Sequence, residues 1–318
     1  MPRGKPHKQK APQLFQVSSC FQKWKNGKDL KMQKTITLPN GVTLGYNEFG
    51  SGDRYLISCQ QNHNSHIAYT IDLAEKHGFH LFQVQIRGYG AAADRATENH
   101  GGSWYDVWAD DAVAFADAMG IDRFFYGGIS HGSGIGWTIA RRHPERMIGF
   151  FAGVPGPHPK DGKETGEARM MTINASKDPV VWKDYASKKA YKQSGPFRKL
   201  AADGIITEEL AEAAYQEQLD FWVNMTPESA QLDPKKPFSD CPTEETLNKE
   251  LEKITIPTLI IGGMQDPIST IETMVRSCKA VKGSEMVIFE DGSHNVLLEH
   301  RAEVVDHIMS FCRGRGLI

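Results

Sequence analysis

The chain has 318 residues, of which 40% are hydrophobic and 24% charged, a composition typical of a globular protein with one core and a subdomain. Its net charge of −2 gives no support to a nucleic-acid partner, and no run of about 18 apolar residues predicts a membrane span. The five cysteines are scattered and odd in number, which favours reduced thiols and a cytoplasmic protein. They are Cys20, Cys59, Cys241, Cys278 and Cys312.

Residues 1–31 carry a net charge of +7 and contain no apolar stretch typical of a secretory signal. We expect residues 1–33 to form a flexible basic extension. The alternative is a segment that docks on the body or on a partner protomer through Phe15, Phe21 and Trp24.

A strand, a tight turn and a helix are predicted around Ser130. The apolar run 124–127 enters the Gly-x-Ser-x-Gly pentapeptide of residues 128–132, and a helix-compatible stretch follows as far as His143. A serine at the apex of such a turn has strained backbone geometry and an exposed hydroxyl. Gly128 and Gly132 lack the Cβ atoms that would crowd this turn. The pattern therefore predicts that Ser130 is a nucleophile.

Between Pro155 and Ile254 the alternation of strands and helices stops. Several helix-like stretches occupy this interval, namely Glu167–Ala175, Pro179–Lys192, Phe197–Ala202 and Thr207–Val223. The interval is predicted to be a helical insertion between two parts of one core.

Two further strands are each followed by a residue that a serine nucleophile needs. Strand-like residues 257–263 precede Asp266, and residues 284–289 precede His294, after which Leu297–Ile308 is predicted to be the closing helix. A serine hydroxyl reacts only when a base accepts its proton. We assign this role to His294, with Asp266 fixing the imidazole tautomer. Asp291 is the rival acid, and Asp-Pro after a strand is also a common turn.

These motifs, in the order serine, acid, histidine, resemble the α/β-hydrolase superfamily, in the branch with a helical cap. The likeness runs from about residue 34 to residue 311 and includes an opening hairpin over Thr35–Tyr46, a turn at Arg87-Gly88-Tyr89-Gly90 and a helix over Tyr105–Met119. It implies an α/β fold with a mostly parallel eight-stranded sheet. The core would comprise residues 34–155 and 254–318, and the cap residues 156–253. A serine nucleophile argues against the dehalogenase and epoxide hydrolase branches, which use a carboxylate.

The resemblance also implies an oxyanion hole, and here the sequence departs from the family pattern. Cys59 and Gln60 occupy the usual His-Gly positions after the third strand, so the amides of Gln61 and His131 are the predicted donors. We expect the His131 ring to line the pocket floor or to pack under it. His63 and His66 lie in the same loop, but no metal-ligand pattern surrounds them, and no metal is predicted.

A cap places some of its aromatic side chains over the serine, which implies an apolar substrate. The alternative for these aromatics is packing within the cap. The predicted pocket residues are Gln60, Asn62, Trp182, Tyr185, Phe221 and Trp222.

The expected function is cofactor-independent hydrolysis of an ester, thioester or lactone of a small, largely apolar molecule. The same residues also support C–C bond, amide or cyanohydrin cleavage, because pocket shape selects the bond. A receptor-like ligand-binding protein is the alternative of another class. We expect a small-molecule substrate, no nucleic-acid or membrane partner, and a monomer or homodimer.

Overall fold

The computed structural model describes residues 34–62, 68–99, 101–204 and 206–318. The predictions for the basic extension and for His63 and His66 therefore fall outside the described residues. Within the described ranges, no helix is both long enough and apolar enough to cross a membrane.

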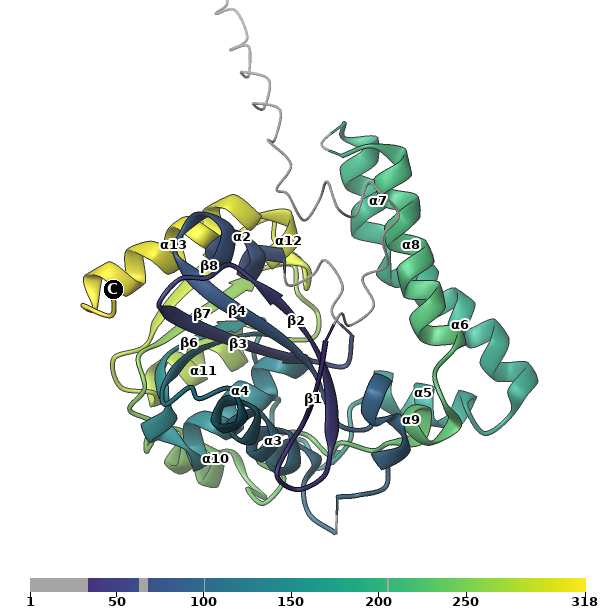
Figure 1. The fold of residues 1–318 in the computed structure, drawn as a ribbon, viewed down its shortest axis with the longest axis horizontal. Helices are drawn as coiled ribbons and strands as arrows, with labels where there is room; N and C mark the ends of the chain where they lie inside the picture. Colours follow the sequence, from purple (N-terminus) through teal and green to yellow (C-terminus); the bar gives the residue numbers. More distant parts are fainter. Residues whose placement is uncertain (1–33, 63–67, 100, 205) are drawn as a thin grey trace, which may run out of the picture.

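An eight-stranded sheet forms the centre of the molecule, with strand order β1-β2-β4-β3-β5-β6-β7-β8 (Figure 1). Only the pairings β1–β2 and β2–β4 are antiparallel, so the predicted mostly parallel sheet is confirmed. The strands are β1 (Lys34–Thr37), β2 (Thr43–Phe49), β3 (Arg54–Gln60), β4 (Phe79–Gln85), β5 (Phe124–Ile129), β6 (Met147–Gly153), β7 (Thr258–Gly263) and β8 (Glu285–Phe289).

Helices cover both faces of the sheet (Figure 1). Every residue of β5, β6 and β7 except Ile148 is buried, as expected where both faces of a parallel sheet are covered. One face carries α3 (Trp104–Ala118), α4 (His131–Arg142), α10 (Glu244–Leu251) and α11 (Ile271–Ala280). The other carries α2 (Ala68–Lys76), α12 (Val296–Glu299) and α13 (Arg301–Gly314), so the predicted closing helix is two helices that break at His300.

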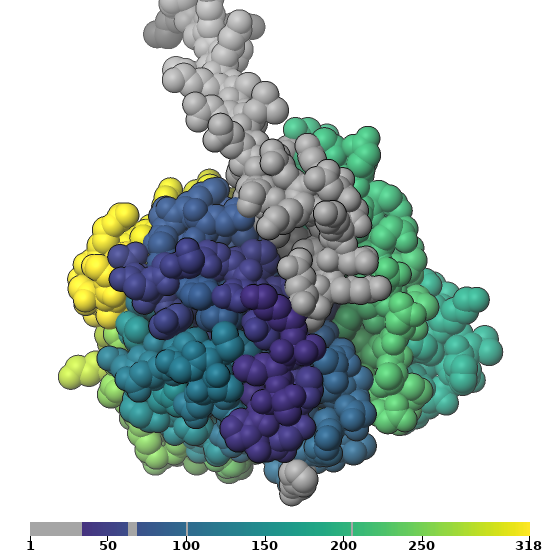
Figure 2. Space-filling model, in the orientation of Figure 1, coloured from purple at the N-terminus to yellow at the C-terminus, as the bar shows by residue number. Residues whose placement is uncertain are grey.

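The helical insertion forms a separate lobe beside the sheet, coloured green in Figures 1 and 2. It contains α5 (Glu167–Ala175), α6 (Pro179–Gln193), α7 (Gly195–Ala202), α8 (Glu208–Val223) and α9 (Pro227–Gln231). Helices α6, α8 and α9 each begin after a side chain that accepts hydrogen bonds from their first turn, which stabilises the helix start. α10, which the predicted cap range included, instead packs Leu247 and Leu251 into the core beneath the sheet.

A buried ion pair holds the turn that follows β4. The Arg87 guanidinium donates from Nε and Nη2 to the two Asp111 oxygens at 2.9 and 2.5 Å, and both side chains are less than 10% exposed. Trp108 Nε1 donates to the Arg87 carbonyl, and Ser229 Oγ of α9 donates to the Gly88 carbonyl at 2.6 Å. The turn therefore connects the core to the cap.

We expect Arg87→Met to lower the free energy of unfolding by about 3–5 kcal/mol, because Asp111 would remain as a buried charge without its partner. The double variant Arg87→Met/Asp111→Leu should recover most of the loss, since it removes both charges. Urea unfolding of the two variants measures this. Equal stability of the single variant and the wild type would show that Asp111 does not need Arg87.

Candidate active site

Ser130 occupies a sharp turn between β5 and α4. Its backbone has φ 50° and ψ −108°, a conformation that costs free energy for any residue with a side chain. Two hydrogen bonds hold it there: Ser130 N–H donates to the Gly153 carbonyl at 2.9 Å, and its own carbonyl accepts from Gly134 N–H at 3.1 Å. The predicted strand, turn and helix are thus present, with the serine at the apex.

The two glycines of the pentapeptide fill positions where no Cβ fits. A Cβ on Gly128 would lie 2.6 Å from the Gly132 carbonyl carbon. A Cβ on Gly132 would lie 2.6 Å from Gln60 Nε2 and 2.7 Å from the Cys59 carbonyl oxygen. All three distances are far below van der Waals contact. The glycine at 128 therefore lets the turn close on itself, and the glycine at 132 lets β3 approach the turn.

Gly132→Ala should therefore lower stability by about 1–3 kcal/mol through overpacking. It should also lower kcat, because the clash displaces the loop that carries Gln61. Gly314→Ala is the matched control, since a Cβ there meets nothing within 4 Å in α13 and an alanine favours the helix. Thermal unfolding and ester hydrolysis of both variants test this. A Gly132→Ala protein as stable and active as the control would contradict the packing argument.

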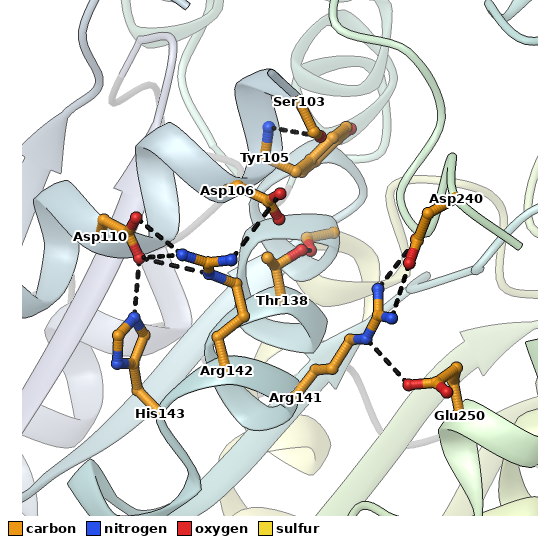
Figure 3. Close-up of polar contacts among 11 residues, drawn as sticks. Ser103, Tyr105, Asp106, Asp110, Thr138, Arg141, Arg142, His143, Asp240 and Glu250 are labelled. Carbon is orange, nitrogen blue, oxygen red and sulfur yellow. Dashed lines mark hydrogen bonds and ion pairs between the residues drawn. The ribbon is translucent and has the colours of Figure 1, made fainter.

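The far end of α4 is anchored by polar contacts to α3, to α10 and to the turn at Asp240 (Figure 3). Arg142 and His143 contact Asp110 of α3 at 2.9 and 2.7 Å, and Arg141 contacts Asp240 and Glu250 at 2.7 and 3.0 Å. Most of these groups are partly exposed, so each pair contributes little stability. Together they fix the orientation of the helix that begins next to Ser130.

The structure brings Ser130, His294 and Asp266 into one hydrogen-bonded chain. His294 Nε2 lies 3.0 Å from Ser130 Oγ, and His294 Nδ1 lies 2.8 Å from Asp266 Oδ2. The second Asp266 oxygen accepts from the backbone N–H groups of Ile268 and Ser269 at 2.8 and 3.1 Å, and the carboxylate is fully buried. This arrangement can hold Nδ1 protonated and leave Nε2 free to accept the serine proton.

The rival acid Asp291 lies elsewhere. Its exposed carboxylate pairs with His300 Nε2 at 2.9 Å. The loop that carries His294 is instead fastened by Glu299, whose carboxylate accepts from Ser293 N–H at 2.8 Å and from Ser293 Oγ at 2.6 Å. The sequence prediction did not include Glu299, and no motif around it indicated this contact.

The loop after β3 is held by two glutamine side chains. Gln60 Nε2 donates to the Ile129 carbonyl at 2.8 Å, directly before Ser130, so this buried side chain braces the turn instead of facing substrate. Gln85 Nε2 donates to the Gln61 carbonyl at 2.8 Å and thereby orients the loop that carries the Gln61 amide. Gln85 was not predicted, because its role depends on the pairing of β3 with β4. Asn62 follows in the same loop and is half-buried.

His131 packs beneath the serine. Its Nδ1 lies 3.2 Å from the Tyr105 hydroxyl, and its ring centroid lies 4.7 Å from that of Trp108. Burial, together with the charge of Arg169, lowers the pKa of His131 to about 3, so the ring is neutral at ordinary pH. Its buried Nε2 has no hydrogen-bond partner in the described part of the chain, and this ring does not reach Ser130 as a base.

A cavity of about 120 Å³ lies beside Ser130. Its lining combines small apolar residues with two histidines and two hydroxyl groups besides that of Ser130. The lining residues are Tyr105, Ser130, His131, Gly134, Val154, Pro155, Gly156, Pro157, His158, Pro237 and Ser269. His158 was not among the predicted site residues.

The predicted aromatic pocket residues pack against one another in the cap and do not line this cavity. Trp182 stacks on Tyr185 at 5.9 Å, and Trp222 is almost fully buried, with Nε1 donating to Gln193 Oε1 at 2.6 Å. Phe221 contacts Trp222 at 5.4 Å and Tyr89 at 6.4 Å between ring centroids. Their helical spacing thus serves the packing of α6 on α8.

Neither a cysteine nucleophile nor a group of metal ligands accompanies the site in the described residues. Burial raises the pKa of the Cys59 thiol to about 12, so it is protonated and is a poor nucleophile. Among the residues that the structure describes, no three His, Cys, Asp or Glu side chains are grouped to hold a metal ion.

Comparison with known proteins places this geometry in a family. A family model described as the alpha/beta hydrolase fold matches residues 59–301. An AB hydrolase superfamily protein, YisY, of Bacillus subtilis (strain 168) is 26% identical over 277 residues, which cover 85% of this chain and 95% of the relative.

Solved structures of similar fold include a meta-cleavage product hydrolase of Pseudomonas fluorescens and a thermophilic esterase of Thermogutta terrifontis. The first has a TM-score of 0.61 at 18% identity and covers 90% of this chain and 100% of its own. The second has a TM-score of 0.63 at 19% identity, and the match covers 88% of this chain and 98% of the esterase. The chain belongs to the alpha/beta hydrolase family.

Proposed function

We propose that the protein is a cofactor-independent serine hydrolase that cleaves an ester, thioester or lactone of a small, largely apolar molecule. The observation that carries the proposal is the hydrogen-bonded chain from Ser130 Oγ through His294 to the buried Asp266 carboxylate. In it, Ser130 attacks the acyl carbon while His294 takes the hydroxyl proton. Asp266 stabilises the resulting imidazolium.

The oxyanion that forms on attack is proposed to lie between the amides of His131 and Gln61. His131 is the first residue of α4, where helix N–H groups have no acceptor within the helix and the helix dipole favours negative charge. Each such donor contributes about 10²–10³ in rate. The alcohol leaves with the proton from His294, and a water activated by the same imidazole hydrolyses the acyl-enzyme.

The cavity supports a small substrate. Its volume of about 120 Å³ is at the small end for a ligand pocket, which favours a small substrate. Val154 and the prolines at positions 155, 157 and 237 give part of its wall an apolar surface that an apolar acyl group could contact. The structural likeness to a meta-cleavage product hydrolase makes C–C bond cleavage the second candidate.

Covalent labelling with diethyl p-nitrophenyl phosphate tests the proposal. We expect one diethylphosphoryl group per chain, located on Ser130 by peptide mass spectrometry, together with loss of p-nitrophenyl ester hydrolysis. Ser187→Ala, at an exposed position on α6, is the control that should label fully. Ester hydrolysis that survives labelling, or a label on another residue, would overturn the assignment. A panel of esters, lactones and β-diketones then ranks the bond types by kcat/KM.

A further inference from the structure

The segment that leaves β6 next to Ser130 is fastened along its backbone. We call residues 154–157 the strap. Each of its four consecutive carbonyl groups accepts a hydrogen bond from a side chain of another element. The donors are Ser269 Oγ to Val154 (2.6 Å), Trp137 Nε1 to Pro155 (3.2 Å), Ser277 Oγ to Gly156 (3.2 Å) and Arg276 Nη2 to Pro157.

The strap is also fixed at its two ends. Val154 N–H donates to the Ile261 carbonyl at 2.7 Å, and its φ of 40° is unusual for a β-branched residue. Beyond the strap, Glu244 accepts from Lys160 N–H at 2.5 Å and pairs with Arg276 at 2.8 Å. A loop held at this many points presents the next side chain, His158, in a defined position.

His158 faces the cavity that it shares with Ser130. Within the described residues, no group forms a hydrogen bond with its half-buried imidazole, and neither ring nitrogen is among the fully buried atoms that lack a partner. Burial lowers the pKa of His158, and the charge of Lys236 adds to the effect. The ring is therefore neutral at pH 7 and offers one N–H donor and one nitrogen acceptor.

The alternative interpretation is that His158 has only a packing role. It does not explain why a firmly held loop places this imidazole in the wall of the cavity that contains Ser130, together with the polar lining residues Tyr105, His131 and Ser269. Because the ring is only half-buried and faces the cavity, its nitrogens can form hydrogen bonds with a polar group of a ligand there.

We propose that His158 is a specificity-determining residue that hydrogen-bonds a hydroxyl or oxo group on a short acyl chain in this cavity. The preferred substrates would then be esters of small hydroxy or oxo acids rather than of plain alkanoic acids. This inference rests on the proposed function, because it requires the acyl group to be attached to Ser130. We place the acyl chain in this cavity because the cavity lies beside Ser130, to which the acyl group becomes attached.

The test compares p-nitrophenyl butyrate with its 3-hydroxy and 2-oxo analogues. For the wild type we expect a higher kcat/KM for at least one analogue than for the plain ester. His158→Phe keeps an aromatic ring but removes both nitrogens. This preference should therefore fall about 10-fold or more, which corresponds to the loss of one hydrogen bond. Plain butyrate should change less than about threefold. His158→Gln, which restores a donor and an acceptor, should recover part of the preference.

The control is His143→Phe at the far end of α4, about 18 Å of helix away from Ser130. It should leave the preference unchanged. An unaltered preference in His158→Phe, or an equal fall for all esters in both His158 variants, overturns the inference and leaves the proposed function standing. The proposed function fails separately, if Ser130→Ala hydrolyses these esters at the wild-type rate.

Discussion

Ser130→Ala should lower kcat for p-nitrophenyl esters by about 10⁴–10⁶-fold, because loss of the nucleophile leaves only binding and oxyanion stabilisation. The fold should persist. The Ser130 hydroxyl contacts His294 alone among the hydrogen bonds described, so its removal leaves no other buried group unpaired. Stopped-flow kinetics and thermal unfolding measure the two effects. A variant that keeps a tenth of the activity would place the nucleophile elsewhere.

The backbone at Ser130 provides a second measurement on the same residue. At φ 50° and ψ −108° alanine keeps the strain of serine, whereas glycine relieves it. We therefore expect Ser130→Gly to be as inactive as Ser130→Ala but more stable, by about 1 kcal/mol or more. Equal unfolding temperatures for the two variants would show that the turn stores no strain.

Asp266→Asn should lower kcat by about 10⁴-fold while the protein stays folded. An asparagine oxygen can still accept from the N–H groups of Ile268 and Ser269, as Asp266 Oδ1 does at 2.8 and 3.1 Å. Its NH₂ group then faces His294 Nδ1, which must become the acceptor. The proton moves to Nε2, and the ring no longer accepts the proton of Ser130.

Asp291→Asn is the matched control, because it replaces one oxygen of the rival carboxylate by an NH₂ group, as Asp266→Asn does at position 266. Asp291 is exposed and pairs with His300, so its loss should alter kcat less than about twofold and stability by less than about 1 kcal/mol. The kcat of both variants on one ester decides between the two carboxylates. A large loss in Asp291→Asn with a small one in Asp266→Asn would reverse the assignment.

The local sequence was sufficient to place the elements that carry the candidate site. Ser130, Asp266 and His294 each follow a short apolar run, and parallel strands bring their carboxyl ends to one edge of a sheet. Helices α5 to α8 of the cap agree with their predicted ranges to within a few residues, because proline, Asp178 and Thr207 mark helix starts, whereas α9 was not predicted. These signals act over a few neighbouring residues, so a single sequence contains them.

Side-chain partners were decided by tertiary structure. Gln60 supports the turn at Ser130 and Gln85 supports the loop after β3 only because β3 pairs with both β4 and β5. The aromatics of α6 and α8 pack together because those helices lie side by side, so these aromatics do not line the cavity beside Ser130.

The Gly-x-Ser-x-Gly motif, its strand and its helix were thus determined by sequence alone, since backbone strain and hydrophobic period are local properties. The sequence alone did not determine whether a given polar side chain contacts the substrate or supports the fold. Gln60 and His158 illustrate this difference: one is bonded to the Ile129 carbonyl and the other faces the cavity. That outcome depends on residues far apart in the sequence, such as Arg276 and Pro157, which are 119 positions apart and whose approach only the complete fold specifies.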